Sequence, residues 1–295
     1  MDPIRVLVRR GGTAEAVHRV HAVAVRGGAV VAERGDATLV TFIRSSAKPF
    51  QALPLARARD DLDERDLAIA SASHLAAPAQ LEAVRALLAK APAGEEELEC
   101  GLAGDSPAPI LHNCSGKHAG MLALCRARGW PSAGYRLADH PVQEAARVEL
   151  AAAAEVPPGE LVAAVDGCGV LTFALPLERM AHAFSRLEEL DGGARVSAAI
   201  RAHPELIRGP SAPDTRLMQL RRGWTAKGGA EGLLCAADSA SGLGIALKVE
   251  DGGARALGVA LARFLAELDL PLPELELELL SNSRGEMVGE LVTAS

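Results

Sequence analysis

Aromatic side chains are scarce in this chain: Phe, Trp and Tyr together make up 3% of its 295 residues. Apolar residues nonetheless account for 49% of the sequence, so alanine, leucine and valine must provide most of the packing. A chain of this length can bury a large core, either as one domain or as two closely packed lobes. The scarcity of aromatics therefore does not exclude an ordinary globular fold.

Positive charge is also in short supply, because 31 Lys and Arg residues face 38 Asp and Glu residues and leave a net charge of −7. Proteins that bind nucleic acid usually carry a basic surface that neutralises phosphates. The charge balance therefore excludes a nucleic-acid binder as the working hypothesis.

Long hydrophobic runs and a cysteine framework are missing as well. The most apolar stretch, residues 232–249, is interrupted by Asp238, two serines and several glycines, so it does not predict a membrane span. The segment 1–5 lacks the basic and then apolar order of a signal peptide. Five cysteines without regular spacing indicate a reducing compartment. We expect a cytoplasmic protein without membrane contacts.

The first forty residues carry β-branched residues in short runs that predict strands over 4–8, 22–25 and 30–33. Arg26-Gly27-Gly28 lies between the second and third of these runs. Consecutive glycines favour the tight turn of an antiparallel hairpin. The beginning of the chain is therefore predicted to contribute strands to a sheet.

The pattern becomes helical from about residue 51 to residue 202, with the clearest helical periods at 81–88 and 142–154. Strands are predicted to return after Gly228, with a buried strand over 244–249. A helix over 254–268 and a last strand over 286–292 follow. Glycine and proline separate these elements.

These elements predict an α/β (α+β) fold with one antiparallel sheet built from the N- and C-terminal parts of the chain. Residues 1–50 and 220–295 would form the sheet lobe, and residues 51–219 would form an inserted, mainly helical lobe. Because no linker separates them, we expect one catalytic unit spanning residues 1–295.

Two serines are candidates for nucleophilic chemistry. Ser45 and Lys48 have the spacing Ser-x-x-Lys, and a lysine can remove a serine proton when its own pKa is lowered. Pro49 favours the first turn of a helix, so this motif is predicted at a helix start. Ser73-His74 is a weaker candidate, and Lys248 is unusual as an amine within an apolar strand. A capping serine and a surface lysine are the alternative interpretation of Ser45 and Lys48.

The segment 112–122 concentrates reactive groups and includes two glycines. It contains Cys114, Lys117 and His118, and Cys168 lies in a second glycine-containing loop. Thiolates favour zinc and similar ions, so Cys114, Lys117 and Cys168 are candidate metal ligands. Inert buried thiols, or a nucleophilic Cys114 paired with His118, are the alternatives.

Five motifs occur in order along the chain. They are Arg44-Ser45-Ser46-Ala47-Lys48-Pro49-Phe50-Gln51-Ala52, Ala72-Ser73-His74, Asn113-Cys114-Ser115-Gly116-Lys117-His118-Ala119-Gly120-Met121, Asp166-Gly167-Cys168-Gly169-Val170 and Lys227-Gly228-Gly229-Ala230-Glu231-Gly232. Together they resemble the Rhizobium etli-type L-asparaginases, also described as asparaginase II. The resemblance extends from about residue 5 to residue 290.

The resemblance implies a fold similar to serine β-lactamases and penicillin-binding proteins, and hydrolysis of L-asparagine to L-aspartate and ammonia. It implies two Ser-Lys pairs, Ser45 with Lys48 and Ser73 with Lys248. In this hypothesis Lys48 accepts the proton of Ser45, which attacks the amide carbon. Donors near the helix start, or the hydroxyl of Ser73, stabilise the oxyanion, and Lys248 tunes Ser73. The sequence leaves open which of the two serines is the nucleophile.

The resemblance further implies a Zn²⁺ site formed by Cys114, Lys117 and Cys168. Asp166, His118 and His74 would lie around the metal or the substrate. The resemblance also implies a homodimer.

One segment departs from the family pattern. After Ala72-Ser73-His74 the family usually continues Ser-Gly-Glu, whereas this chain continues Leu75-Ala76-Ala77. A glutaminase or other small-amide hydrolase, a catalytically weak amino-acid binding protein and a structural zinc protein therefore stay as alternatives to an asparaginase.

Overall fold

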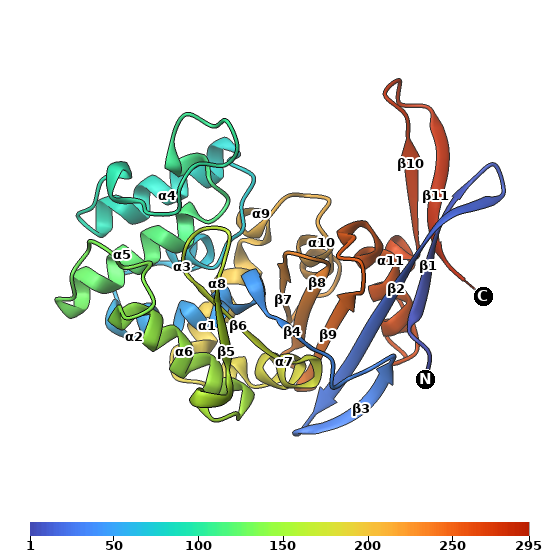
Figure 1. Ribbon diagram of the computed structural model, residues 1–295, viewed down its shortest axis with the longest axis horizontal. Helices are drawn as coiled ribbons and strands as arrows, with labels where there is room; N and C mark the ends of the chain where they lie inside the picture. The colour runs from blue at the N-terminus through green and yellow to red at the C-terminus, as the bar shows by residue number, and fades with distance from the viewer. Residues whose placement is uncertain (295) are drawn as a thin grey trace.

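The structure is a computed structural model that describes residues 1–294, and its main feature is an eight-stranded antiparallel sheet (Figure 1). The order is β10-β11-β1-β2-β9-β8-β7, and β3 pairs with β2. The strands are β1 (Ile4–Arg10), β2 (Thr13–Arg26), β3 (Ala29–Arg34), β7 (Trp224–Gly229), β8 (Leu233–Asp238), β9 (Leu243–Val249), β10 (Leu277–Ser281) and β11 (Met287–Thr293). Because β1 pairs with β11, both ends of the chain enter one sheet.

The strands are explained by the alternation of buried and more exposed residues along each of them. In β1, Ile4, Val6 and Val8 are buried, whereas the residues between them are more exposed, as expected for a strand with one face on a core. Gly27 and Gly28 have φ values of +56° and +79° and make the turn between β2 and β3, which glycine adopts without steric cost. The predicted hairpin is confirmed.

A second, three-stranded sheet has the order β4-β6-β5, with β4 (Val40–Phe42), β5 (Val162–Val165) and β6 (Leu171–Pro176). The sequence pattern predicted a helical region throughout 51–202, so β5 and β6 correct that prediction. Both strands are short, and β5 is largely exposed. A four-residue segment rich in alanine carries too little periodicity to reveal a strand.

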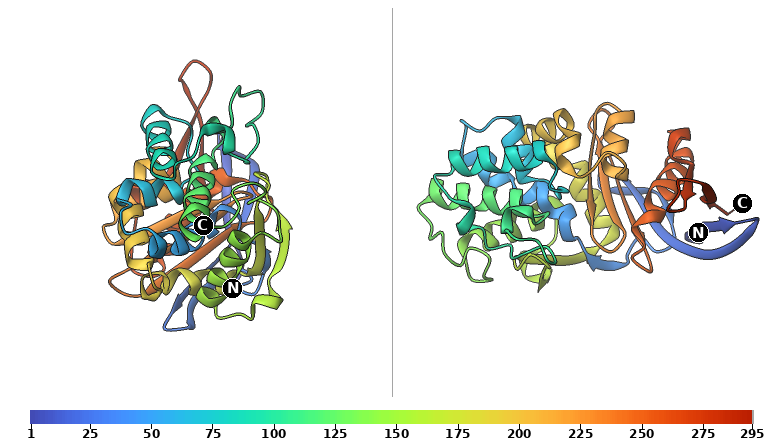
Figure 2. Two further views of the ribbon diagram at one scale, coloured as in Figure 1. Left: turned by 90° about the vertical axis from the view of Figure 1, so that its left-hand side faces the viewer. Right: turned by 90° about the horizontal axis from the view of Figure 1, so that it is seen from above.

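Helices fill most of the chain between residues 48 and 220. They are α1 (Lys48–Gln51), α2 (Leu53–Ala58), α3 (Glu64–Ala70), α4 (Pro78–Lys90), α5 (Ser115–Arg128), α6 (Pro141–Ala154), α7 (Leu177–Ser185), α8 (Gly193–Ala202), α9 (Pro204–Ile207) and α10 (Pro213–Leu220). The predicted helical periods 81–88 and 142–154 fall within α4 and α6. Figure 2 shows most of these helices gathered at the opposite end of the molecule from the two chain termini.

The remaining predicted elements are also present. The strand over 244–249 is β9, the helix over 254–268 is a 3₁₀ turn followed by α11 (Leu257–Ala266), and the last strand is β11. Helix α7 packs on β2, β8 and β9, and α11 packs on β1, β9 and β11. The predicted α/β fold, with a central antiparallel sheet from both ends of the chain and a helical lobe between them, is confirmed. Within residues 1–294, every helix is too short or too polar to cross a membrane.

Candidate active site

The Ser-x-x-Lys motif lies where a 3₁₀ turn, η1 (Arg44–Ala47), leads into α1. Pro49 stands in the first turn of α1, where its missing N–H leaves no helical bond unmade. Arg44 has a φ of +48°, an unusual value for a residue other than glycine. The prediction that the motif lies at a helix start is confirmed. The positive φ of Arg44 also shows that the backbone directly before Ser45 is strained.

Lys48 is buried to 1% exposure and its amine lies among other candidate residues. The Nζ atom donates hydrogen bonds to the carbonyl of Ala72, to Ser73 Oγ at 3.0 Å and to Cys114 Sγ at 3.4 Å. Burial lowers the pKa of Lys48; the Cys114 thiolate opposes this and the nearby Lys117 charge adds to it. The structure thus joins Lys48 to Ser73 and gives the amine a reason to be neutral.

Ser45 and Ser73 differ in accessibility. Ser45 is half-buried, whereas Ser73 is 1% exposed and bonded to Lys48. Ser46 points inward, and its hydroxyl donates to the carbonyl of Lys227 at 2.8 Å. Ser45 is therefore the candidate hydroxyl that a substrate can reach.

The structure does not bring Lys248 to Ser73. Lys248 lies on β9, where its Nζ donates to the carbonyls of Glu231, at 2.8 Å, and Val249, at 2.5 Å. In the register its neighbours are His21 of β2 and Leu233 of β8. The predicted pairing of Lys248 with Ser73 is corrected on this geometry, because the alternation of β9 turns the amine toward the β7–β8 turn.

Lys227 of β7 is the lysine that sequence reasoning missed. It is fully buried, its Nζ donates to the carbonyl of Gly228 at 2.7 Å, and it lies 4.0 Å from Asp214 Oδ2. Burial lowers the pKa of Lys227 to about 7, with Asp214 opposing the shift and the charges of Lys48 and Arg208 adding to it. The signal was available in the sequence, because Lys227-Gly228-Gly229 opens one of the five motifs.

Cys114, Lys117 and Cys168 come together as predicted. Lys117 Nζ lies 3.1 Å from Cys168 Sγ, and all three side chains are almost fully buried. A hydrogen bond from Cys168 holds the pKa of the Cys114 thiol well below its ordinary value, and the Lys48 and Lys117 charges add to this effect. The same bond raises the pKa of Cys168. One thiol of the pair is thus disposed to be a thiolate.

This cluster fits a metal by the chemistry of its donors. Two sulfurs and one amine converge, which is a soft donor set that zinc accepts. Burial lowers the pKa of Lys117, but the two cysteines outweigh it and raise the pKa overall, so the amine must lose a proton to bind a metal. Among residues 1–294, no group of three or more His, Cys, Asp and Glu side chains offers another metal site.

His74 connects the Ser73 segment to the beginning of α5. Its Nδ1 accepts the N–H of Ala76 at 3.1 Å, so the proton is on Nε2, which donates to Ser115 Oγ at 2.8 Å. Burial, followed by the Lys48 charge, lowers the pKa of His74 to about 4. A neutral His74 therefore orients the Cys114 turn without carrying a charge.

His118 and Asp166 lie around the cluster. The Tyr135 hydroxyl accepts the N–H of Glu99 at 2.8 Å and lies 2.8 Å from His118 Nδ1, whereas His118 Nε2 has no partner among the described residues. Burial lowers the pKa of His118 well below its ordinary value. Asp166 forms an ion pair with Arg44 at 2.8 Å, which ties the Cys168 loop to the turn that carries Ser45.

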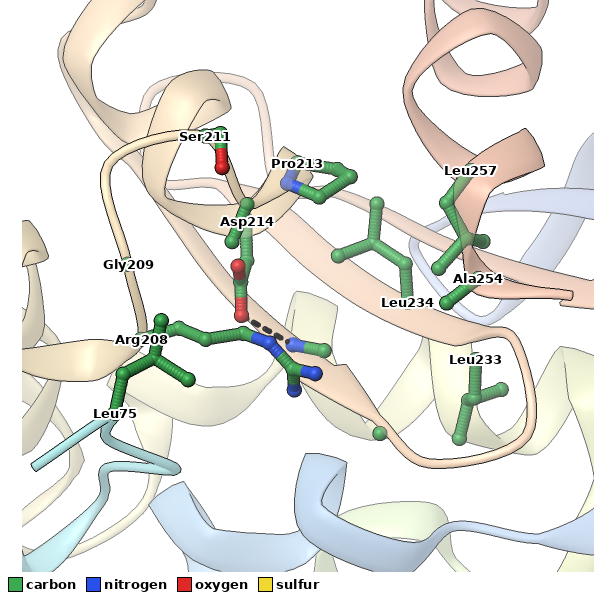
Figure 3. A pocket seen from close by; sticks show the side chains of 13 residues that line it. Leu75, Arg208, Gly209, Ser211, Pro213, Asp214, Leu233, Leu234, Ala254 and Leu257 are labelled. Atoms are coloured by element: carbon green, nitrogen blue, oxygen red, sulfur yellow. Dashed lines mark hydrogen bonds between the residues drawn. The ribbon is translucent and has the colours of Figure 1, made fainter. Parts of the chain in front are cut away.

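A cavity of about 260 Å³ is lined by chain neighbours of the site residues, and Ser45, Lys48, Ser73 and Lys227 are not part of its lining (Figure 3). Its walls include Leu75, Arg208 and Gly228. Two of these wall residues are close in the chain to site residues, since Leu75 follows Ser73 by two positions and Gly228 follows Lys227 directly. The third, Arg208, follows Ile207, whose carbonyl accepts a hydrogen bond from the N–H of Ser73 at 2.7 Å. The cavity is therefore the candidate substrate pocket. Its wall at Leu75 is the segment that departs from the family pattern.

Residues 6–293 match the family described as L-asparaginase II. No curated protein is similar enough to match the chain. The solved structures that are similar include the native form of Mglu, with 13% identity and a TM-score of 0.49 over 86% of this chain and 66% of that one. They also include a β-lactamase from Mycobacterium bovis, with 18% identity and a TM-score of 0.44 over 84% of this chain and 94% of that one. The chain thus spans slightly less than two thirds of the length of Mglu.

Proposed function

We propose that this chain, which belongs to the L-asparaginase II family and is thereby an amide hydrolase, converts L-asparagine to L-aspartate and ammonia. We place it with the Rhizobium etli-type enzymes of that family because the five ordered motifs of the sequence match theirs. The observation that carries the proposal is the contact of Lys48 Nζ with Ser73 Oγ at 3.0 Å, in a buried site that also holds Lys227.

The proposed nucleophile is Ser45, since its hydroxyl is the more accessible of the two. Neutral Lys48, three residues further along the chain, accepts the Ser45 proton while Ser45 Oγ bonds to the side-chain amide carbon. The proton then passes to the amide nitrogen, and the carbon–nitrogen bond breaks to release ammonia. Water then attacks the resulting ester and gives a proton to Lys48. The bond from Ser45 Oγ to the acyl carbon breaks, Lys48 returns the proton to Ser45 Oγ, and L-aspartate is released.

Ser73 and Lys227 support this chemistry. The Ser73 hydroxyl accepts a hydrogen bond from the Lys48 amine at 3.0 Å and is the proposed side-chain donor for the oxyanion. One such donor is worth about 3 kcal/mol in the transition state. Burial lowers the pKa of Lys227 most, Asp214 opposes this shift, and the Lys48 charge adds to it. Like charges near one another favour a state in which one of the two amines is neutral. Lys227 takes the role that the sequence had given to Lys248.

The proposed zinc ligands are Cys114, Lys117 and Cys168. When bound, zinc would supply a positive centre that helps to position a polar substrate. Arg44 and Asp166 couple this cluster to the Ser45 turn through their ion pair. His74 holds the beginning of α5 through Ser115. These residues position the site and carry none of the covalent steps.

The deciding experiment measures ammonia release from L-asparagine by the purified protein and by Ser45→Ala and Ser73→Ala. We expect Ser45→Ala to lose about 10⁴-fold or more in kcat, as for other serine nucleophiles, and Ser73→Ala to lose about 10²- to 10³-fold. Ser239→Ala, at an exposed turn, is the matched control and should keep full activity. Near-normal turnover by Ser45→Ala would contradict the assignment of the nucleophile.

The same assay separates the substrates. L-Glutamine is one methylene longer, and a pocket distinguishes such a difference by about 10- to 200-fold. We expect L-asparagine to be preferred. A reversed preference would identify a glutaminase, and binding without release of ammonia would identify an amino-acid binding protein.

A further inference from the structure

The pocket beside Ser73 has charged groups at one end and apolar walls at the other. Figure 3 shows the side chains of Arg208 and Asp214 at the charged end, where a dashed line marks the hydrogen bond that Asp214 accepts from the N–H of Gly228. The apolar walls come from Leu233, Leu234 and Leu257. The two ends differ enough in chemistry to orient a small ligand.

Arg208 is held at this position by its backbone. The carbonyl of Arg208 accepts from Gln80 Nε2 at 2.5 Å, and Gln80 also donates to the carbonyl of Glu205 at 2.9 Å. Ile207 is fixed by its bond from the Ser73 N–H. Among residues 1–294 no carboxylate forms an ion pair with the Arg208 guanidinium, so its charge is free to face the cavity.

Asp214 is 1% exposed and lies in the first turn of α10. It accepts the backbone N–H groups of Gly228 at 2.7 Å and Thr215 at 3.0 Å. A carboxylate has about four lone-pair positions, so Asp214 can accept further hydrogen bonds. Within residues 1–294, Asp214 forms no ion pair with Arg208. A ligand with a negative and a positive group can therefore lie between the two side chains.

We propose that Arg208 and Asp214 bind the α-amino-acid end of the substrate, Arg208 the α-carboxylate and Asp214 the α-ammonium group. Guanidinium and carboxylate match each other in geometry and charge. Because Asp214 Oδ2 lies 4.0 Å from Lys227 Nζ, a ligand held by Asp214 lies next to one of the two buried lysines of the site. This assignment rests on the proposed function and makes the pocket specific for free α-amino acids.

The experiment measures the binding of L-aspartate by calorimetry, which needs no turnover. We expect Arg208→Gln to weaken binding about 10- to 100-fold, since a hydrogen bond to a charged partner is lost. Arg208→Lys should recover part of the loss, and Arg222→Gln, at an exposed arginine just beyond α10, should bind as the wild type does. Thermal unfolding of each variant establishes that it is folded.

Substrate analogues test each charge separately. The wild type should prefer L-asparagine to its α-carboxamide, which lacks the α-carboxylate, and this preference should collapse in Arg208→Gln. It should prefer L-asparagine to succinamic acid, which lacks the α-amino group, and this preference should collapse in Asp214→Asn. Ratios of two substrates are insensitive to a general loss of activity in either variant.

The outcomes separate the two proposals. Arg208-dependent binding of L-aspartate without any ammonia release would contradict the proposed hydrolysis and support the pocket assignment. Ammonia release with unchanged binding and preferences in Arg208→Gln would support the hydrolysis and overturn the pocket assignment. Failure of the wild type to bind L-aspartate would also overturn it.

Discussion

Lys48 and Lys227 are both almost fully buried, which is rare for a side chain whose ordinary form is charged. The cost of burying an ammonium group is what lowers the pKa of each lysine. Lys48 lies on α1 and contacts Ser73, and Lys227 lies on β7 near Asp214. At the scale of single residues, the site obtains its reactivity from burial.

Lys227 gives a pH-dependent contribution to stability. Its pKa falls from an ordinary value of 10.5 to about 7 in the folded chain, so between these values the unfolded chain binds more protons and stability rises with pH. The groups that act on it are Asp214, Lys48, Arg208 and Cys114. We expect Lys227→Met to remove up to about 1.4 kcal/mol of this rise per pH unit.

The measurement is urea unfolding of the wild type and Lys227→Met at intervals from pH 7 to pH 9. Lys90→Met is the control, because hydrogen bonds to Asp66 and Asp63 raise the pKa of Lys90, so this amine stays protonated in the folded and the unfolded chain from pH 7 to pH 9. Parallel stability curves for the wild type and Lys227→Met would show that the Lys227 amine keeps an ordinary pKa.

The position of α5 against α3 decides the geometry of the cysteine cluster. A Cβ atom at Gly116 would lie 2.2 Å from the carbonyl oxygen of Ile69, and one at Gly120 would lie 2.9 Å from the Ala70 side chain. The two helices can approach this closely only because α5 has glycine at both positions. This approach carries Cys114 and Lys117 to Lys48.

Gly116→Ala should therefore destabilise the protein by about 1–3 kcal/mol and reduce kcat, because the added methyl group pushes α5 away from α3. Chemical denaturation and the ammonia assay measure the two effects. Gly159→Ala is the matched control, since nothing lies within 4 Å of its added Cβ, and its change should stay within about 0.5 kcal/mol. Equal effects of the two substitutions would contradict the close approach.

The loops before α5 and after β5 are joined by the cysteine cluster, and metal binding should stabilise this junction. A ligand present at 100 times its Kd stabilises the folded state by about 2.7 kcal/mol. We expect Zn²⁺ to raise the thermal midpoint of the wild type and a chelator to reverse the rise. Cys114→Ser and Cys168→Ser should not respond.

Cys100→Ser is the control for this experiment, because Cys100 is buried but its thiol bonds the carbonyl of Pro109, outside the cluster. It should keep the full response to Zn²⁺. A zinc-dependent rise that survives in Cys114→Ser would place the metal elsewhere.

At the scale of the whole molecule, the sheet unites both ends of the chain. Leu291 of β11 is fully buried and pairs with Val8 of β1. We expect Leu291→Ala to lower the free energy of unfolding by about 2–5 kcal/mol, as for other large buried side chains, without changing kcat of the folded protein. Urea unfolding and the ammonia assay measure both effects.

The two tryptophans report on different parts of the molecule, Trp130 just after α5 and Trp224 on β7. If the chain is one cooperative unit, single-tryptophan variants should unfold at the same urea concentration with either reporter, and Leu291→Ala should shift both equally. Two separate midpoints would indicate lobes that unfold independently.

The sequence by itself determined the elements with strong local signals. The Gly27-Gly28 hairpin, the alternating β1, the periodic α4 and α6, and the start of α1 at Pro49 are all set by residues close together in the chain. The motifs also sufficed to group Cys114, Lys117 and Cys168, and to single out Lys48 and Ser73 as members of one site.

Only the tertiary structure revealed that Lys227 is fully buried and that Lys248 lies away from Ser73. Lys227 and Lys248 both lie in apolar strands, and local sequence does not tell which face of a strand meets the helical lobe. The strands β5 and β6, and the pocket between Arg208 and Asp214, likewise depend on segments far apart in the chain. Long-range packing sets burial, and burial sets the pKa of each amine, so the chemistry of this site follows from the fold.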